Sequence, residues 1–140
     1  MKCVKIYDRL PDSAREIRTA VFTQEQGFTE EFDEKDGVSV HLVMFDGDTP
    51  IGTCRVFPKG ETGEYFLGRL AVIRAYRGQG IGGGLVKAAE EYVRGTRGTG
   101  ILLHAQCAAE AFYEKCGYIS FGEVDDEEGC PHVWMRKDLS

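Results

Sequence analysis

The chain has 140 residues, of which 42% are hydrophobic and 29% charged, and its formal net charge is −6. This length fits a single domain with a buried core. The acidic balance argues against nucleic acid as a partner, and no apolar run approaches the roughly 18 residues of a membrane-spanning helix.

The first residues lack the apolar segment of a signal peptide, and the odd number of cysteines, five, favours free thiols. We therefore expect one cytoplasmic domain over residues 1–140, with no metal site, because no Cys or His spacing matches a ligand pattern.

The amino-terminal half of the sequence predicts four elements and one tight turn. Ser13 and Glu16 have the spacing of a capping box at the start of a helix. Asp46-Gly47 lies between two β runs and predicts a hairpin. The expected elements are a strand over 2–7, a helix over 13–27, and strands over 38–45 and 51–58.

The second half continues the alternation of strands and helices. Gly68 inside an otherwise regular strand indicates a bulge or a close approach of another backbone. The expected elements are strands over 64–73, 100–106, 118–124 and 132–139, and helices over 81–93 and 108–117. The order βαβββαβαββ predicts an α/β (α+β) fold in which helices cover both faces of a mixed sheet.

A glycine-rich stretch joins the fourth of these strands to the following helix. Five glycines occupy the seven positions from Gly78 to Gly84, and the surrounding residues 69–97 hold six basic side chains against two acidic ones. A glycine-rich loop at a helix start presents backbone N–H groups, backed by the helix dipole, to an anion. Glycines that merely relieve crowding in a flexible turn are the alternative, but Arg77 at the loop edge favours a phosphate or pyrophosphate.

Two other phosphate motifs do not fit this stretch. Gly78, Gly80 and Gly83 satisfy G-x-G-x-x-G, but four residues, "RAYR", separate them from the strand. The acid that would hold a dinucleotide ribose about 20 residues later is missing. No Lys-Ser/Thr pair completes a Walker A loop.

The motifs resemble those of the GCN5-related N-acetyltransferases (GNAT family). The acetyl-CoA signature of that family, Gln/Arg-x-x-Gly-x-Gly/Ala, is matched by Arg77-Gly78-Gln79-Gly80-Ile81-Gly82. About 30 residues on, "AEAFYEKCGY" at 109–118 is similar to the family's late Ala-x-x-x-Tyr-Glu-Lys-x-Gly-Phe segment. From "AVFTQEQGF" to "GCPHVWMRK" the chain resembles the ElaA/YjcF-type branch, over nearly its whole length.

The resemblance implies a fold and a cosubstrate. It implies a mixed sheet of about seven strands that splays between strands four and five, flanked by about four helices, with acetyl-CoA in the gap. The pantetheine arm would then pair with the backbone of Leu70, Ala71 and Val72, and the pyrophosphate would meet the N–H groups of Arg77, Gly78, Gln79, Gly80, Ile81 and Gly82.

Two further residues follow from the resemblance. Tyr113 matches the tyrosine that hydrogen-bonds the CoA sulfur and protonates the leaving thiolate, although a core aromatic beside Phe112 remains the alternative. Seven residues earlier the family commonly has an asparagine that touches pantetheine, and this chain has Gln106. Gln106 keeps the amide on a longer arm, so we expect altered contact geometry.

The general base and the acceptor are less defined. An incoming amine must lose a proton, and the sequence leaves the base open among several side chains and a bound water. Arg69 could bind a substrate carboxylate or pair internally, and Cys107 and Cys116 lack an evident base for covalent catalysis. Acids at 30–36 favour a cationic acceptor. The base candidates are Glu25, Asp33, Asp36, His41 and His132.

The sequence thus predicts an N-acetyltransferase that moves an acetyl group from acetyl-CoA to a primary amine of a small molecule or peptide, by direct attack in a ternary complex. Its expected partners are acetyl-CoA and the amine, without nucleic acid or membrane, and a homodimer is left open. A silent CoA-binding sensor or partner-binding module is the alternative function, and a nucleotide-binding domain is a third.

Overall fold

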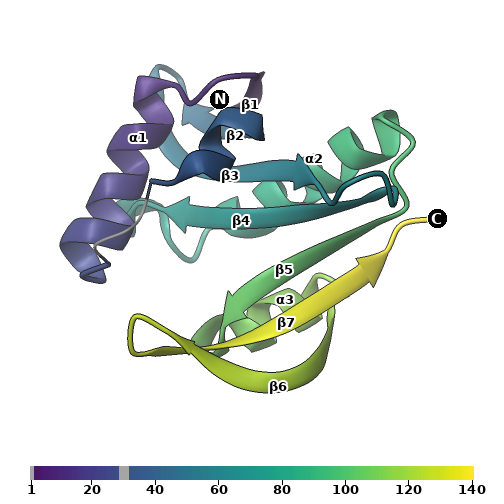
Figure 1. Cartoon of the computed structure of the whole chain (residues 1–140). Helices are drawn as coiled ribbons and strands as arrows, with labels where there is room; N and C mark the ends of the chain where they lie inside the picture. The colour runs from purple at the N-terminus through teal and green to yellow at the C-terminus, as the bar shows by residue number, and fades with distance from the viewer. Residues whose placement is uncertain (1, 29–31) are drawn as a thin grey trace.

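The computed structural model describes residues 2–28 and 32–140, and within them all strands join one seven-stranded sheet (Figure 1). The order across the sheet is β1-β2-β3-β4-β5-β7-β6. The strands are β1 (Lys2–Tyr7), β2 (Val40–Asp46), β3 (Thr49–Pro58), β4 (Glu64–Val72), β5 (Gly100–Gln106), β6 (Ile119–Glu127) and β7 (Cys130–Asp138). The pair β4–β5 is parallel and the other neighbours are antiparallel. The predicted mixed sheet is confirmed.

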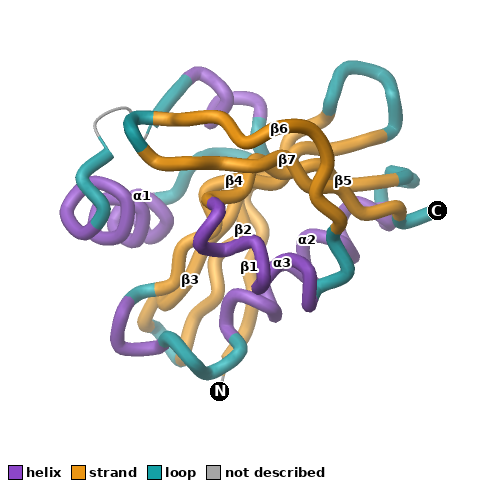
Figure 2. The backbone as a smooth tube through the Cα atoms, turned by 90° about the horizontal axis from the view of Figure 1, so that it is seen from below, coloured by secondary structure: helices purple, strands orange, loops and turns teal. Residues whose placement is uncertain are grey.

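Helices cover the two faces of the sheet unequally (Figures 1 and 2). On one face, Leu85 and Val93 of α2 (Ile81–Gly95) are fully buried in the larger core together with Tyr113 of α3 (Glu110–Lys115). On the other face, Ala14 and Ile17 of α1 (Asp12–Arg18) form a smaller core with β2 and β4. Because α1 packs on β2, β3 and β4, no α-helix of residues 2–28 and 32–140 covers the β5–β7–β6 half of that face (Figure 1). No helix among the described residues is long and apolar enough to cross a membrane.

Several local predictions differ from the structure. The predicted capping box is wrong, because α1 begins at Asp12 after an N-cap Pro11 with no side-chain cap bond. The predicted single helix over 13–27 is two elements in the structure, because α1 ends at Arg18 and a π-helix follows over Thr19–Glu25. The 3-10 helix Glu34–Val38 was not predicted. Short 3-10 helices, Arg74–Tyr76 and Cys107–Ala109, precede α2 and α3.

The last two strands are longer than the sequence predicted and form one hairpin. Glu127 pairs with Cys130, so the connecting loop is only Glu128-Gly129, with φ of 51° and 78°. Two successive positive φ values are typical of a type I′ turn, which matches the twist of the flanking strands. Strand β6 therefore continues to Glu127, and it includes acidic residues that the predicted strand, which ended at 124, left out.

Strands β4 and β5 pair only over their first halves. Their register runs from Glu64 opposite Gly100 to Leu67 opposite Leu103. On its other side, β4 has a bulge at Arg69 and Leu70, because Thr53 faces Ala71 while Arg55 faces Gly68. Arg69 has a φ of 53°, unusual for a residue with a side chain. The bulge predicted from Gly68 is confirmed, and the strands splay beyond it.

A buried ion network joins α1, the 3-10 helix and the bulged strand. Asp36 accepts hydrogen bonds from Arg18 at 2.7 and 3.1 Å and from Arg55 at 3.1 Å. Asp33 accepts bonds from Arg55 at 2.6 Å and Arg69 at 3.3 Å. Burial raises the pKa of Asp36, but the Arg18 guanidinium outweighs it and holds that pKa at about 2. The network therefore contributes stability that depends on Asp36 being charged.

We predict that Asp36→Asn lowers the free energy of unfolding by about 3 kcal/mol or more, because it removes the negative charge of Asp36 from the buried guanidinium groups of Arg18 and Arg55. A carboxyl with a lowered pKa stabilises the fold above its ordinary pKa of 3.8, and this contribution is lost as pH falls toward about 2. Urea unfolding between pH 2 and 7 should therefore show a shallower acid loss in the variant than in the wild type.

Asp48→Asn, in the exposed β2–β3 turn, is the matched control and should change stability by no more than about 0.5 kcal/mol. Equal stability of the Asp36 variant and the wild type would contradict the role given to the network.

Candidate active site

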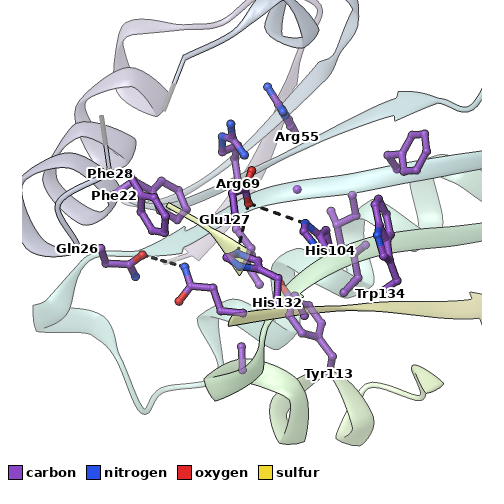
Figure 3. Close-up of a pocket in the computed structure, with 18 of the residues that line it drawn as sticks. Phe22, Gln26, Phe28, Arg55, Arg69, His104, Tyr113, Glu127, His132 and Trp134 are labelled. Carbon is purple, nitrogen blue, oxygen red and sulfur yellow. Dashed lines mark hydrogen bonds and ion pairs between the residues drawn. The ribbon is translucent and has the colours of Figure 1, made fainter. Parts of the chain in front are cut away.

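A cavity of about 380 Å³ opens where β4 and β5 separate (Figure 3). The splayed halves of β4 and β5 form two of its walls, and α3, the β6–β7 hairpin and the π-helix close the others. Of the site residues predicted from the sequence, Leu70, Gln106 and Tyr113 line the cavity. A volume of this size lies near the lower end of the range for pockets that bind small molecules, about 300–1,000 Å³.

The remaining predicted residues lie beside the cavity rather than in its walls. Ala71 is buried against α1 in the smaller core, and the carbonyl oxygen of Val72 accepts a 3.0 Å bond from Arg77 Nε. The glycine loop reaches the cavity indirectly. A Cβ atom at Gly82 would stand 3.1 Å from the ring of Phe112, which lines the cavity.

The glycine loop has the backbone geometry of an anion site. Gly78 and Gly80 both have a φ of 78°, and residues that carry a Cβ atom rarely adopt this conformation. Gly80 is the N-cap of α2, and no side chain caps this end of the helix. The first N–H groups of a 15-residue helix are thus left for a ligand or water.

The positive charge expected at the loop is partly neutralised. Both terminal nitrogens of Arg77 donate to Glu25, at 2.6 and 2.8 Å, and Arg74 lies 3.4 Å from the same carboxylate. The hydrogen bond from Arg77 lowers the pKa of Glu25 to about 2. Glu25 therefore ties the loop to the π-helix and is ill suited to accept a proton at neutral pH.

Tyr113 is both a core residue and a cavity residue. It packs edge-on against Phe112 and Tyr118, with ring centroids 4.9 and 6.0 Å apart. Within the described chain its hydroxyl makes no hydrogen bond. Burial raises the pKa of Tyr113 above its ordinary value. The hydroxyl is therefore a neutral donor facing the cavity.

Gln106 spans the open end of the splay. Its Nε2 donates to Oε1 of Gln26 at 2.8 Å (Figure 3), although the two residues are 80 positions apart in the sequence. This bond joins the end of β5 to the end of the π-helix. It occupies one of the two N–H groups of the Gln106 amide, so a ligand contact through that group requires the bond to open.

The base candidates divide clearly by position. Asp36 and His41 lie outside the cavity, and His41 Nε2 stands 3.0 Å from the carbonyl oxygen of Asp36. Burial lowers the pKa of His41. Asp33 lines the cavity. Burial raises the pKa of Asp33, but the hydrogen bond and the charge of Arg55 outweigh burial, so this pKa lies below its ordinary value. His132 is the candidate that lines the cavity without an arginine partner among the described residues.

His132 is held in a defined orientation. Its Nδ1 lies 2.8 Å from the carbonyl oxygen of Cys130, to which only an N–H can donate, so Nε2 of the neutral ring is a proton acceptor. Nε2 stands 3.4 Å from Glu127. A ring held with an acceptor nitrogen on its free side suits a general base.

Sequence reasoning missed His104, which the structure places beside His132. The two rings are 4.7 Å apart, and His104 Nε2 is 2.7 Å from Asp125. The available signal was a lone polar residue in the apolar run "GILLHAQ". The expectation that acids at 30–36 face the acceptor is not tested as such: residues 30 and 31 lie outside the described residues, and Asp33 and Asp36 are paired internally.

The two cysteines considered for covalent catalysis, Cys107 and Cys116, lie outside the cavity walls. Burial raises the pKa of the Cys116 thiol. Across residues 2–28 and 32–140, no group of three or more His, Cys, Asp or Glu side chains is arranged to hold a metal ion.

Comparisons with known proteins agree with this geometry. The model of the acetyltransferase (GNAT) family matches residues 5–118. YjcF of Bacillus subtilis, an uncharacterised N-acetyltransferase, is 37% identical over 125 residues, which are 87% of this chain and 88% of YjcF. The crystal structure of Escherichia coli ElaA is 26% identical, with a TM-score of 0.87 over 98% of this chain and 99% of ElaA.

An aminoglycoside 6′-N-acetyltransferase crystallised with coenzyme A has the same fold, with a TM-score of 0.79 and 19% identity over 99% of this chain and 97% of that enzyme. The strand order, the splay and these matches define an acyltransferase fold. The chain belongs to the GNAT family of acetyltransferases, and its relatives include YjcF and ElaA, as the sequence motifs predicted.

Proposed function

We propose that residues 1–140 act as one domain that transfers the acetyl group of acetyl-CoA to a primary amine by direct attack in a ternary complex. The observation that carries this proposal is the hydroxyl of Tyr113, which makes no hydrogen bond to any residue that the structure describes and lies at the cavity where β4 and β5 splay. A coenzyme A complex of a protein with the same fold supports it.

In this proposal the cosubstrate lies between the two strands. The pyrophosphate binds the N–H groups from Arg77 to Gly82 at the start of α2, and the pantetheine arm pairs with β4 along Leu70, Ala71 and Val72. Because Arg77 already holds the carbonyl oxygen of Val72, the pairing falls mainly on the bulge. Unpaired backbone N–H groups beside a thioester can stabilise the oxyanion of a tetrahedral intermediate.

Tyr113 then acts on the leaving sulfur. Since burial raises its pKa, above the value of about 8.5 for an ordinary thiol, complete transfer of its proton to the thiolate is uphill by itself. The hydroxyl stabilises the developing charge as a hydrogen-bond donor. It passes its proton to sulfur as it gains the proton that the attacking nitrogen releases.

His132 supplies the base that the sequence left unassigned. A protonated amine loses two protons on becoming an amide: His132 Nε2 takes the first and delivers it to solvent, and the second ends on the CoA sulfur. The carboxylate of Glu127, 3.4 Å from Nε2, stabilises the imidazolium that forms. The neutral amine attacks the thioester carbon, and the carbon–sulfur bond breaks.

Calorimetric titration with acetyl-CoA, CoA and NAD tests the cosubstrate, followed by thiol-release assays with a panel of amines. Binding of both CoA species without NAD, and release of thiol with an amine, would support the proposal. CoA binding with no turnover for any amine would favour the silent sensor instead.

Gly80→Val should raise the Kd for acetyl-CoA at least about tenfold, because a β-branched residue is strained at a φ of 78° and disturbs the loop where phosphate oxygens approach. Isothermal titration measures the Kd. Gly60→Val introduces the same strain at a φ of 54° in the β3–β4 loop, away from the cavity, and should leave the Kd unchanged. Unaltered affinity in the Gly80 variant would remove the phosphate role from the loop.

Tyr113→Phe should lower kcat by about 10² to 10⁴, the usual contribution of a general acid, while acetyl-CoA binding is kept because the ring remains. Tyr118→Phe is the matched control. It removes a hydroxyl that donates to Glu90 at 3.0 Å outside the cavity, so it should reduce stability and spare kcat. Full turnover in the Tyr113 variant would show that water or another group protonates the sulfur.

His132→Gln should lower kcat at neutral pH by about 10² or more. The deficit should shrink as pH rises toward the ordinary amine pKa of about 10, because more of the acceptor then arrives neutral. Steady-state rates from pH 6 to 10 measure this, with His41→Gln, outside the cavity, as control. A deficit that stays constant over the whole range would mean that His132 only positions the acceptor.

A further inference from the structure

The acceptor side of the cavity is walled by a continuous series of rings. Successive ring centroids are 5.2 Å apart for Phe57 and Phe66, 5.9 Å for Phe66 and Trp134, 4.7 Å for Trp134 and His104, and 4.7 Å for His104 and His132. We call this series the aromatic row. It crosses β3, β4, β5 and β7, and all five rings line the cavity. Figure 3 shows three of them, His104, His132 and Trp134.

The aromatic row lies on the face of the sheet that α1 leaves uncovered. Leu67, Leu103 and Met135 pack into the core below α2. Since successive side chains of a strand alternate between faces, Phe66, His104 and Trp134 point to the opposite face. Each of these three rings keeps part of its surface accessible. Aromatic surface kept open beside a reaction site is suited to stacking against a flat ligand.

The charges near the row favour a cation. Residues 116–135 hold five acids and no Lys or Arg. Glu127 and Glu128 line the cavity, and Asp125 and Glu127 contact the two histidines of the row. Across the cavity, the guanidinium groups of Arg55 and Arg69 both contact Asp33, and Arg55 also contacts Asp36. The hairpin wall is therefore negative, and the opposite wall is internally paired.

The order of the rings places the cation at one end. Gln106 is opposite His132, and His104 is opposite Trp134 in the β5–β7 register. The row thus begins beside the proposed base and continues away from it toward Phe66 and Phe57. The step from His132 to Trp134 along β7 is about 7 Å, the reach of an amine joined to a ring by an ethyl or propyl chain.

We propose that the acceptor is an arylalkylamine, a protonated primary amine joined by a short alkyl chain to one aromatic ring system, which stacks on the aromatic row. This assignment rests on the proposed acetyl transfer and names its substrate class. The ammonium group lies between His132 and Glu127, and the ring lies against Trp134 and Phe66. A cavity of about 380 Å³ that also admits the acetyl end of the cosubstrate has room for a single ring system.

Trp134 permits a direct test without any cosubstrate, because it is the only tryptophan of the chain. Its emission is titrated with phenethylamine and 3-phenylpropylamine, which do not contain the indole of Trp134. Hexylamine and phenylacetate are the controls that lack the ring and the positive charge, respectively. We expect saturable quenching by the arylalkylamines, and at least about tenfold weaker binding of both controls. Equal binding of hexylamine would overturn the role of the rings, and equal binding of phenylacetate would overturn the role of the acids.

A ring deletion separates the row from general apolar contact. Phe66→Leu should lower kcat/KM for phenethylamine by about 3- to 10-fold, the range for one lost ring contact, with the KM for acetyl-CoA unchanged. Phe121→Leu, at an exposed ring of β6 that does not line the cavity, should leave both constants unchanged. The same loss in both variants, or in neither, would contradict the assignment.

The two proposals fail differently. If the protein binds acetyl-CoA and acetylates hexylamine with the same kcat/KM as phenethylamine, the acetyltransferase proposal stands and the arylalkylamine assignment is wrong. If acetyl-CoA does not bind in calorimetry, the proposed transfer fails whatever the fluorescence shows.

Discussion

The separation of β4 from β5 is the constraint on which the rest of the structure depends. Beyond Leu67 and Leu103 the two parallel strands no longer pair, yet buried backbone groups must find partners. The bulge at Arg69 and Leu70 turns β4 away and leaves its edge beside a cavity. The strands therefore separate because the bulge lies directly after their last paired residues, and not because a loop is inserted between them.

Holding the strands apart requires support from outside the sheet. Arg69 adopts a positive φ, and such a conformation persists only where surrounding contacts stabilise it. Its guanidinium lies 3.3 Å from Asp33, which Arg55 binds in turn. The buried network thus connects the bulge to the 3-10 helix and, through Asp36 and Arg18, to α1. On the other side of the gap, Gln26 and Gln106 join the π-helix to β5.

The sequence predicted the parts of the site that rest on local chain geometry. The glycines at 78 and 80 need a positive φ, and a loop of that kind can be recognised from consecutive residues. Tyr113 was identified because a short motif surrounds it. The aromatic row could not be found in this way, because Phe57 and Trp134 lie 77 positions apart and meet only through strand register. The pairing of Asp36 with Arg18 was hidden for the same reason, so the sequence suggested that the acids at 30–36 favour a cationic acceptor.

The acidic residues of the β6–β7 hairpin have two physical roles, at the edge of the sheet and beside the cavity. As the outermost strand, β6 exposes an unpaired edge, and charged side chains on such an edge prevent association with another sheet. That demand alone would be met by charges directed only to solvent. Asp125, however, lies 2.7 Å from His104, and Glu127 lies between the two histidines, 3.8 and 3.4 Å from them. Carboxylates in contact with imidazole rings that line the cavity place negative charge where a ligand would lie, which edge protection does not require. The same acidic hairpin that protects the edge therefore gives one wall of the cavity its negative charge.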